Sequence, residues 1–198
     1  MLTSHLLGCG LLAAVSAERL VELWVSRRHG RILRARGAVE AGRGHYPPMI
    51  ALHTGLLLAC AIEPWLFPGA WPRAVAVPAA ALVLLSQALR WWVVATLGVR
   101  WSTRVLVLPG ATPVKGGPYR WVRHPNYLAV VVEVAALPLA CGAWRTAICA
   151  SLLDAALLRA RIRAEERALG SLWAEAFRGV PRLLPGGAVG REGLRDRS

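Results

Sequence analysis

The sequence contains little charge for its length, and especially little negative charge. Charged residues make up 18% of the 198 residues, with 24 lysines and arginines against 11 aspartates and glutamates, whereas 56% of the residues are hydrophobic. A soluble domain has about 25% charged and about 45–50% apolar residues. The composition therefore predicts a membrane protein, and the length favours one domain covering residues 1–198.

Metal-ligand and dinucleotide motifs are also lacking. Four cysteines are present, but none belongs to a Cys-x-x-Cys pair or a Cys/His metal spacing, so neither a disulfide nor a metal site is predicted. The only short glycine pair near the start, "GCG" at 8–10, lies inside an apolar stretch and not between a strand and a helix. The sequence therefore predicts no Rossmann domain.

What the sequence does contain is a series of long apolar stretches. A membrane-spanning helix needs about 20 predominantly apolar residues. Five stretches approach or reach this length, and the last two are separated by little more than Gly142, which is typical of a tight helical hairpin; the five cover residues 2–25, 48–67, 74–97, 126–142 and 144–159. We predict an all-α integral membrane bundle of about five transmembrane helices.

Basic residues alternate along the chain and predict its orientation. Six of them lie in 27–46, five in 98–126 and nine after residue 158, and the intervening connections contain almost none. This is the positive-inside pattern of a multi-pass protein of the cell inner membrane. It places the N-terminus outside and the C-terminus in the cytoplasm. It also argues against nucleic acid as a partner, because no basic face with interleaved aromatic residues is present.

These features divide the single domain into three parts. Residues 1–97 contain three predicted spans, residues 98–182 contain a loop, the helical hairpin and a polar extension of the last helix, and residues 183–198 resemble a flexible tail. The loop includes the Gly- and Pro-rich stretch 107–120, which cannot be helical throughout.

Several ionisable side chains lie inside the predicted spans. Each costs roughly 2.5–3.5 kcal/mol on insertion scales, so we expect these groups to face the bundle interior or a cavity. Arg90 is expected to pair with an acidic residue of a neighbouring helix. The complete set is Glu18, Glu22, His53, Glu63, Arg90, Glu133 and Asp154.

Two polar clusters are expected to meet at the cytoplasmic ends of the last two helices. In "GPYRWVRHPNYLAV", 117–130, Pro125 suits the first turn of a helix, and Arg123 and His124 precede it at the end of the helix that attracts anions. In "RIRAEERAL", 161–169, Arg161 and Glu165 are four residues apart and can pair, while Glu166 lies about 100° further round the helix. The clusters indicate either a ligand pocket or a lattice of charges at the membrane surface.

The two clusters resemble the signature of the isoprenylcysteine carboxyl methyltransferase family. The matching motifs are Gly117-Pro118-Tyr119-x-x-x-Arg123-His124-Pro125-x-Tyr127 and Arg161-x-x-x-Glu165-Glu166-x-x-Leu169, and the similarity is strongest over about 110–182. Two stretches, "GRGHYPPMIALHTGLLL" at 42–58 and the residues around 123–138, are more specifically similar to bacterial members associated with type III polyketide synthases. Those members are thought to methylate hydroxyl groups of alkylpyrones or alkylresorcinols.

The resemblance implies a cofactor, a reaction and a set of residues. It implies that S-adenosylmethionine binds at the cytoplasmic side of the last helices, in a pocket shaped by Tyr119, His124, Pro125, Tyr127 and Glu165 or Glu166. It implies an acceptor oxygen near Arg123, with His124 or Glu166 as the base for a weakly acidic hydroxyl. Arg123 and Glu166 are thus the expected catalytic residues.

The acceptor implied by the resemblance is a lipophilic molecule carrying a carboxylate or an acidic hydroxyl, of the alkylpyrone, alkylresorcinol or prenylcysteine type. Membrane lipids are the surrounding partners. Two positions depart from the family pattern after the Glu-Glu pair, because Trp173 and Phe177 stand where many relatives have tyrosines. Ala129 also replaces a common glycine.

Two other functions fit some of these features. Membrane sterol and steroid reductases contain a similar "RHPNY" motif and an acidic C-terminal motif, so an NADPH-dependent reductase is an alternative. A non-enzymatic membrane scaffold is the other. Binding of S-adenosylhomocysteine at the polar clusters would indicate the methyltransferase, and binding of NADPH would indicate the reductase.

Overall fold

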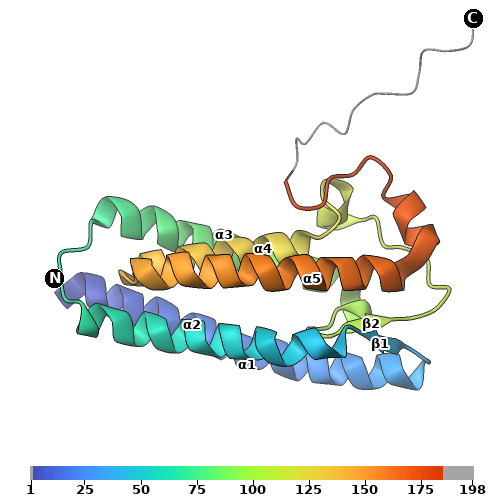
Figure 1. Ribbon diagram of the computed structural model, residues 1–198, viewed down its shortest axis with the longest axis horizontal. Coiled ribbons are helices and arrows are strands. Elements are labelled where there is room, and N and C mark those ends of the chain that lie inside the picture. The colour runs from blue at the N-terminus through green and yellow to red at the C-terminus, as the bar shows by residue number, and fades with distance from the viewer. Residues whose placement is uncertain (1, 185–198) are drawn as a thin grey trace, which may run out of the picture.

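The computed structural model describes residues 2–184, with side chains from Gly8 onward, and consists mainly of five α-helices (Figure 1). The predicted tail, residues 183–198, lies outside this range except for its first two residues. The helices are α1 Leu2–Ala35, α2 Tyr46–Leu66, α3 Arg73–Leu97, α4 Pro125–Cys141 and α5 Trp144–Ala176. The shorter elements are strands β1 Val39–Ala41 and β2 Val105–Val107 and 3₁₀ helices η1 Arg43–His45, η2 Gly98–Arg100 and η3 Gly117–Arg120.

The helices run side by side along the long axis of the molecule, and α4 lies against both α3 and α5 (Figure 1). Helix α2 packs on α5 and α4, and α1 contacts α4 and α2. The α2–α3 and α4–α5 turns lie at one end of the bundle. At the other end lie the antiparallel pair β1–β2, η3 and the segment that follows α5 (Figure 1). We call this second end the loop end.

Helices α1 and α5 are longer than the apolar stretches 2–25 and 144–159 that predicted them. Helix α1 continues ten residues beyond the predicted end at 25, through the arginine-rich segment, to Ala35. Arginine is a good helix former, so the loss of hydrophobicity does not end the helix. Two residues beyond its end lies Gly37, whose φ is 85°. The N–H of Gly37 donates to the Arg34 carbonyl and that of Ala38 to the Leu33 carbonyl, both at 3.0 Å, which is the Schellman pattern.

Within residues 2–184, two segments are long and apolar enough to cross a membrane. They are Arg43–Leu66 and Arg73–Arg100, each with a mean hydropathy of 1.5, and only 22% of each apolar window is buried. The core helix of a soluble protein would be mostly buried, whereas here large apolar side chains such as Trp65, Leu84 and Leu85 are exposed. Helix α4 is apolar but shorter. The all-helical prediction is confirmed.

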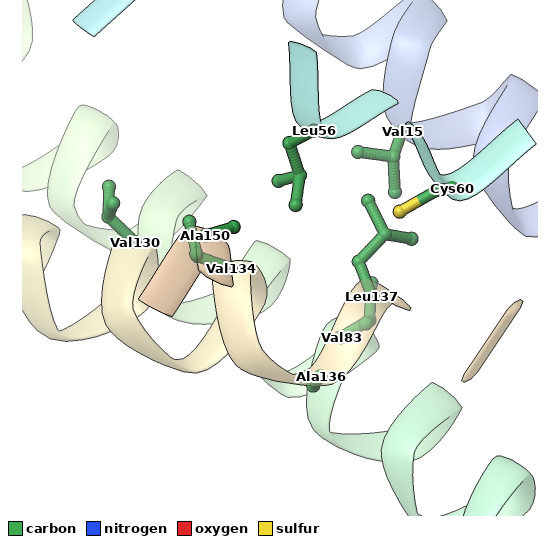
Figure 2. Close-up of a cluster of buried hydrophobic side chains, with 9 residues drawn as sticks. All are labelled: Val15, Leu56, Cys60, Val83, Val130, Val134, Ala136, Leu137 and Ala150. Atoms are coloured by element: carbon green, nitrogen blue, oxygen red, sulfur yellow. The ribbon is translucent and has the colours of Figure 1, made fainter. Parts of the chain in front are cut away.

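The apolar core draws on all five helices. Its residues are Val15, Leu56, Cys60, Val83, Val130, Val134, Ala136, Leu137 and Ala150. In Figure 2, Leu137 of α4 points toward Val15 of α1 and Cys60 of α2. Cys60 therefore packs as a small hydrophobic residue, as its apolar surroundings in the sequence suggest.

A cluster of buried charges lies beside this core and joins α1, α3 and α4. Arg90 contacts Glu133 at 2.5 Å and Glu22 at 3.3 Å. Arg19 contacts Glu22 at 2.6 Å and also pairs with Glu133. We call Arg19, Glu22, Arg90 and Glu133 the charge cluster. The expected pairing of Arg90 with an acidic residue of a neighbouring helix is confirmed.

Glu63 has a separate structural role at the far end of the bundle. Its carboxylate, on α2, accepts hydrogen bonds from the backbone N–H groups of Arg145 at 3.0 Å and Thr146 at 2.8 Å. The Thr146 hydroxyl donates to it at 2.6 Å. These N–H groups belong to the first turn of α5 and have no acceptor within that helix. Glu63 therefore caps α5 from a neighbouring helix, a role that the sequence did not indicate.

The charge cluster yields a prediction about stability. Replacing Glu133 with alanine removes a buried carboxylate that the buried guanidinium of Arg90 and the partly buried one of Arg19 share, and we expect the free energy of unfolding to fall by about 3–5 kcal/mol. The measurement is thermal or denaturant unfolding in detergent, with Glu175→Ala on the exposed face of α5 as the control. Equal losses in the two variants would contradict the importance assigned to the cluster.

Candidate active site

The first polar cluster forms the start of α4 at the loop end. His124 precedes the helix and Pro125 occupies its first turn, as predicted. The approach to the helix depends on Gly117 in η3, which has a φ of 53°. A Cβ atom at this position would overlap the Thr96 hydroxyl, so the close contact of η3 with α3 requires glycine.

The segment after α5 folds back onto the same place. Gly170 interrupts α5 with φ 74° and ψ −167°, a conformation essentially restricted to glycine, and the chain then turns toward α4. The backbone N–H of Arg123 donates to the Pro181 carbonyl at 2.8 Å and that of His124 to the Arg182 carbonyl at 3.0 Å. The Arg123 Nε donates to the Val180 carbonyl at 2.5 Å. We call residues 180–182 the return segment.

Glu166 of α5 contacts both His124, at the start of α4, and Arg182 of the return segment. It lies 3.1 Å from His124 Nε2 and accepts two hydrogen bonds from Arg182, at 2.9 and 2.7 Å. Partial burial raises the pKa of Glu166, but the hydrogen bonds and charges of Arg182 and His124 outweigh it and leave the pKa below its ordinary value. Glu166 is therefore ionised at neutral pH, and each of its carboxylate oxygens accepts a hydrogen bond from Arg182.

Glu165 and Arg161 meet through Tyr127. The Tyr127 hydroxyl donates to Glu165, and Arg161 Nε donates to the same hydroxyl at 2.9 Å. Arg161 also donates to the Thr103 carbonyl. The expected direct pair between Arg161 and Glu165 is wrong, since no ion pair joins them within the described part of the chain. The phenol between them replaces it because α4 packs close enough to insert a side chain.

A cavity of about 290 Å³ lies among these residues at the loop end. We call it the loop-side cavity. Five residues expected from the sequence line it: Tyr119, Arg123, His124, Tyr127 and Glu165. Pro125 and Glu166 do not. Burial, together with the negative charge of Glu165, raises the pKa of Tyr119, so its hydroxyl stays protonated and can donate a hydrogen bond.

Trp173 and Phe177, which stand where many relatives have tyrosines, form one aromatic wall of this region. The ring of Trp173 lies 5.3 Å from that of His124 and 4.9 Å from that of Phe177, and Trp173 lines the loop-side cavity. Phe177 is fully buried behind it. An indole here offers a flat surface for a ring, without the phenolic hydroxyl that a tyrosine would bring.

A second cavity, of about 170 Å³, lies deeper between the helices. We call it the helix-side cavity. Helix α2 contributes Tyr46, Met49, His53 and Leu57, which follow one another at helical spacing, and Arg19, Glu22 and Arg90 of the charge cluster form another wall. Tyr46 lines this cavity, and His45 lines neither cavity.

Four side chains line both cavities and form the partition between them: Trp101, Asn126, Tyr127 and Arg161. Tyr127 was expected at the site, and Asn126 and Arg161 stand in the two motifs without an assigned role. Trp101 was missed, because it is a single aromatic residue in a polar connection. Its indole N–H lies 3.4 Å from the Asn126 side-chain oxygen.

The partition and its surroundings carry guanidinium, amide, phenol and carboxylate groups, from Arg161, Asn126, Tyr127 and the neighbouring Glu165. The guanidinium and the amide can orient and stabilise an oxygen that carries negative charge. No group of three histidine, cysteine, aspartate or glutamate side chains suited to a metal ion occurs among the residues that the structure describes.

The position of Glu166 yields a pH-dependent prediction. Its pKa is lowered on folding, so its contribution to stability is complete above its ordinary pKa of 4.5 and is lost as the pH falls through the lower folded value. We expect Glu166→Gln to lower the free energy of unfolding at pH 7 by about 1 kcal/mol, since Arg182 is exposed to solvent. The difference between variant and wild type should shrink in acid.

Unfolding curves of both proteins at neutral pH and below 4.5 provide the measurement, with Glu175→Gln as a control on the exposed face of α5. A variant whose deficit is constant across this range would contradict the role of an ionised Glu166.

Comparison with known proteins identifies the family. A profile of the isoprenylcysteine carboxyl methyltransferase (ICMT) family matches residues 79–171, which contain α4, most of α3 and α5, and the partition. The chain is 38% identical over 162 residues to the uncharacterized protein YpbQ of Bacillus subtilis, covering 80% of this chain and 94% of that protein. An uncharacterized protein of Haemophilus influenzae is 27% identical over 162 residues, covering 81% of this chain and 94% of its own. The chain belongs to the ICMT family.

Proposed function

We propose that this protein is a membrane O-methyltransferase that uses S-adenosylmethionine to methylate a carboxylate or acidic hydroxyl of a lipophilic acceptor. The observation that carries the proposal is the pair of cavities meeting at one partition. A polar cavity at the loop end suits a water-soluble methyl donor, and a cavity between apolar helices suits a lipid. Membership of the ICMT family supports methyl transfer as the reaction.

The loop-side cavity has the chemistry that S-adenosylmethionine requires. The cofactor supplies a methyl group bound to a positively charged sulfur. Glu165 can hold the cationic ammonium group of the cofactor, and Arg100 and Arg104 can hold its carboxylate. Tyr119 and Trp173 offer aromatic surfaces for the adenine. His124 completes this wall, so Tyr119, His124, Tyr127 and Glu165 keep their proposed role in cofactor binding, whereas Pro125, which does not line the cavity, fixes the start of α4.

Arg161 is better situated than Arg123 to orient the acceptor oxygen. Arg161 lines both cavities, whereas Arg123 lines only the loop-side cavity and donates to Val180. Glu166 lines neither cavity and is held by His124 and Arg182. We therefore assign Arg123 and Glu166 the role of positioning residues, which fix the return segment and His124. Alignment of the reacting oxygen can supply much of the rate of a displacement.

The acceptor tail has a path along α1 and α2. Beyond the helix-side cavity, the same two helices and Cys141 of α4 line a further cavity of about 360 Å³, which we call the distal cavity. Leu23 and Leu57 line the first cavity, and Leu12, Ala13, Cys60 and Ala61 line the second, one to three turns further along. This arrangement supports an acceptor with a linear apolar chain, such as an alkylpyrone or alkylresorcinol.

The charge distribution supports the proposed topology of five spans with the active site at the cytoplasmic face of the inner membrane. The arginine-rich end of α1, the connection after α3 and the end of α5 lie together at the loop end (Figure 1). Basic residues are retained on the cytoplasmic side. The methyl donor would then reach its cavity from the cytoplasm.

A direct binding measurement tests the proposed cofactor. We expect the purified protein in detergent to bind S-adenosylhomocysteine in calorimetry, and Glu165→Gln and His124→Ala to weaken binding at least about tenfold, which corresponds to loss of about 1.4 kcal/mol. Glu175→Gln is the matched control on the same helix.

NADPH serves as the competing ligand in the same assay. Binding of NADPH without S-adenosylhomocysteine would favour the reductase alternative. Binding of neither ligand by a folded protein would favour the scaffold.

A second prediction tests the path of the acceptor tail. Ala13→Phe places a ring in the distal cavity, and we expect it to slow methylation of long-chain alkylresorcinols at least about tenfold while sparing short-chain ones, because overpacking a filled site is costly. Ala14→Phe, one residue further on α1 and outside the cavity, is the control. Equal effects on both chain lengths would exclude the distal cavity as the tail site.

A further inference from the structure

We propose that His53 is a catalytic residue of this reaction: the base that accepts the proton of a hydroxyl acceptor in the helix-side cavity. This inference rests on the proposed function and goes beyond it, because it selects a hydroxyl acceptor over a carboxylate. His53 lies in the stretch 42–58, outside the family profile match at 79–171 and outside both polar clusters.

His53 lines the helix-side cavity together with the four residues of the partition. An acceptor whose oxygen reaches the partition from this side has His53 as a neighbour in the same small space. Helix α2 fixes the side chain, since Tyr46, Met49, His53 and Leu57 share one face. The position is thus set by a regular helix and not by a loop.

The hydrogen bond of His53 determines which ring nitrogen is available. Nδ1 lies 2.9 Å from the Met49 carbonyl oxygen, which can only accept a hydrogen bond. Nδ1 must therefore carry the proton, and in the neutral ring Nε2 holds a free lone pair. No hydrogen bond to Nε2 is found within residues 2–184. An available imidazole lone pair in a cavity is what a general base requires.

The other candidate bases are already engaged. Both oxygens of Glu166 accept hydrogen bonds from Arg182, and His124 Nε2 faces the same carboxylate. Glu22, which also lines the helix-side cavity, is paired with Arg19 and Arg90. His53 is the one histidine among the residues that line this cavity, and no described side chain hydrogen-bonds to its Nε2.

Cationic groups around His53 favour the ionised form of an acceptor. Three guanidinium groups, those of Arg19, Arg90 and Arg161, line the cavity, but only one carboxylate, that of Glu22, lines it. Such donors can bind an oxygen that gains negative charge. The ionisable groups facing this space are Arg19 and Glu22 from α1, Tyr46 from α2, Arg90 from α3, Tyr127 and Glu133 from α4, and Arg161 from α5.

The proposed step balances without another reactant. The acceptor oxygen forms a bond to the methyl carbon, and the carbon–sulfur bond of the donor breaks with its electron pair remaining on sulfur. The hydroxyl proton passes to Nε2 of His53. A carboxylate acceptor has no such proton, and an acidic enol needs little help, whereas a phenol depends on the base.

Two acceptors of similar shape make the test specific: a long-chain alkylresorcinol, whose phenol is weakly acidic, and a long-chain hydroxyalkylpyrone, whose enol is strongly acidic. His53→Asn retains a donor for the Met49 carbonyl and removes the basic nitrogen, and His53→Gln is the second variant. The control is His45→Asn, a histidine that lines neither cavity. Unfolding curves and binding of S-adenosylhomocysteine establish that each variant is folded.

We expect the His53 variants to bind S-adenosylhomocysteine normally and to lose kcat/KM by about 10²–10⁴-fold with the resorcinol. The loss with the pyrone should be smaller than tenfold, and raising the pH toward ionisation of the phenol should restore part of the resorcinol activity. His45→Asn should match the wild type. These results together would establish His53 as the base.

Equal losses with both acceptors, or no loss with either, would overturn the inference. It would also be overturned if the wild type bound S-adenosylhomocysteine but methylated neither acceptor or only the pyrone, while the proposed methyltransferase would still stand. A folded wild type that failed to bind S-adenosylhomocysteine would overturn the proposed function and this inference together.

Discussion

Four clustered charges, three of them buried, determine how the helices of this protein can pack. Glu133 of α4 accepts from Arg90 of α3 and Arg19 of α1, and Glu22 of α1 binds the same two arginines. Each charge alone would be expensive in an apolar bundle, so the four must remain together. Rotation or sliding of α1 would separate them. The cluster therefore fixes α1 against α3 and α4 and, with it, one wall of the helix-side cavity.

Tyr127 plays a corresponding role at the loop end. Its hydroxyl lies between Arg161 and Glu165, and Arg161 continues to the Thr103 carbonyl. Thr103 is held in turn by Ser26 of α1, at 2.8 Å between the hydroxyl oxygens. One chain of polar contacts thus runs from α5 through α4 and the loop to α1. It forms part of the partition, so the two cavities stay distinct but adjacent.

Under the proposed function, this arrangement separates the routes of the two ligands. The loop-side cavity is lined by charged and aromatic residues from the connections, while the helix-side and distal cavities lie between helices whose outer faces are apolar. A polar methyl donor and a lipophilic acceptor could then approach one partition without sharing a route. The return segment, which Glu166 and Arg123 hold against α4, covers the loop end of this arrangement.

The sequence by itself determined the helical class, the helices near 48–67, 74–97 and 126–142, and five residues of the loop-side cavity, because apolar length and motif spacing are local properties. It did not determine which polar residues meet. The Tyr127 bridge between Arg161 and Glu165, the capping of α5 by Glu63 and the place of Trp101 all join residues far apart in the chain. The helix-side cavity, with His53 in its wall, exists only because α1, α2, α3 and α5 pack around α4, and side-chain packing between distant segments leaves no periodic signal in a single sequence.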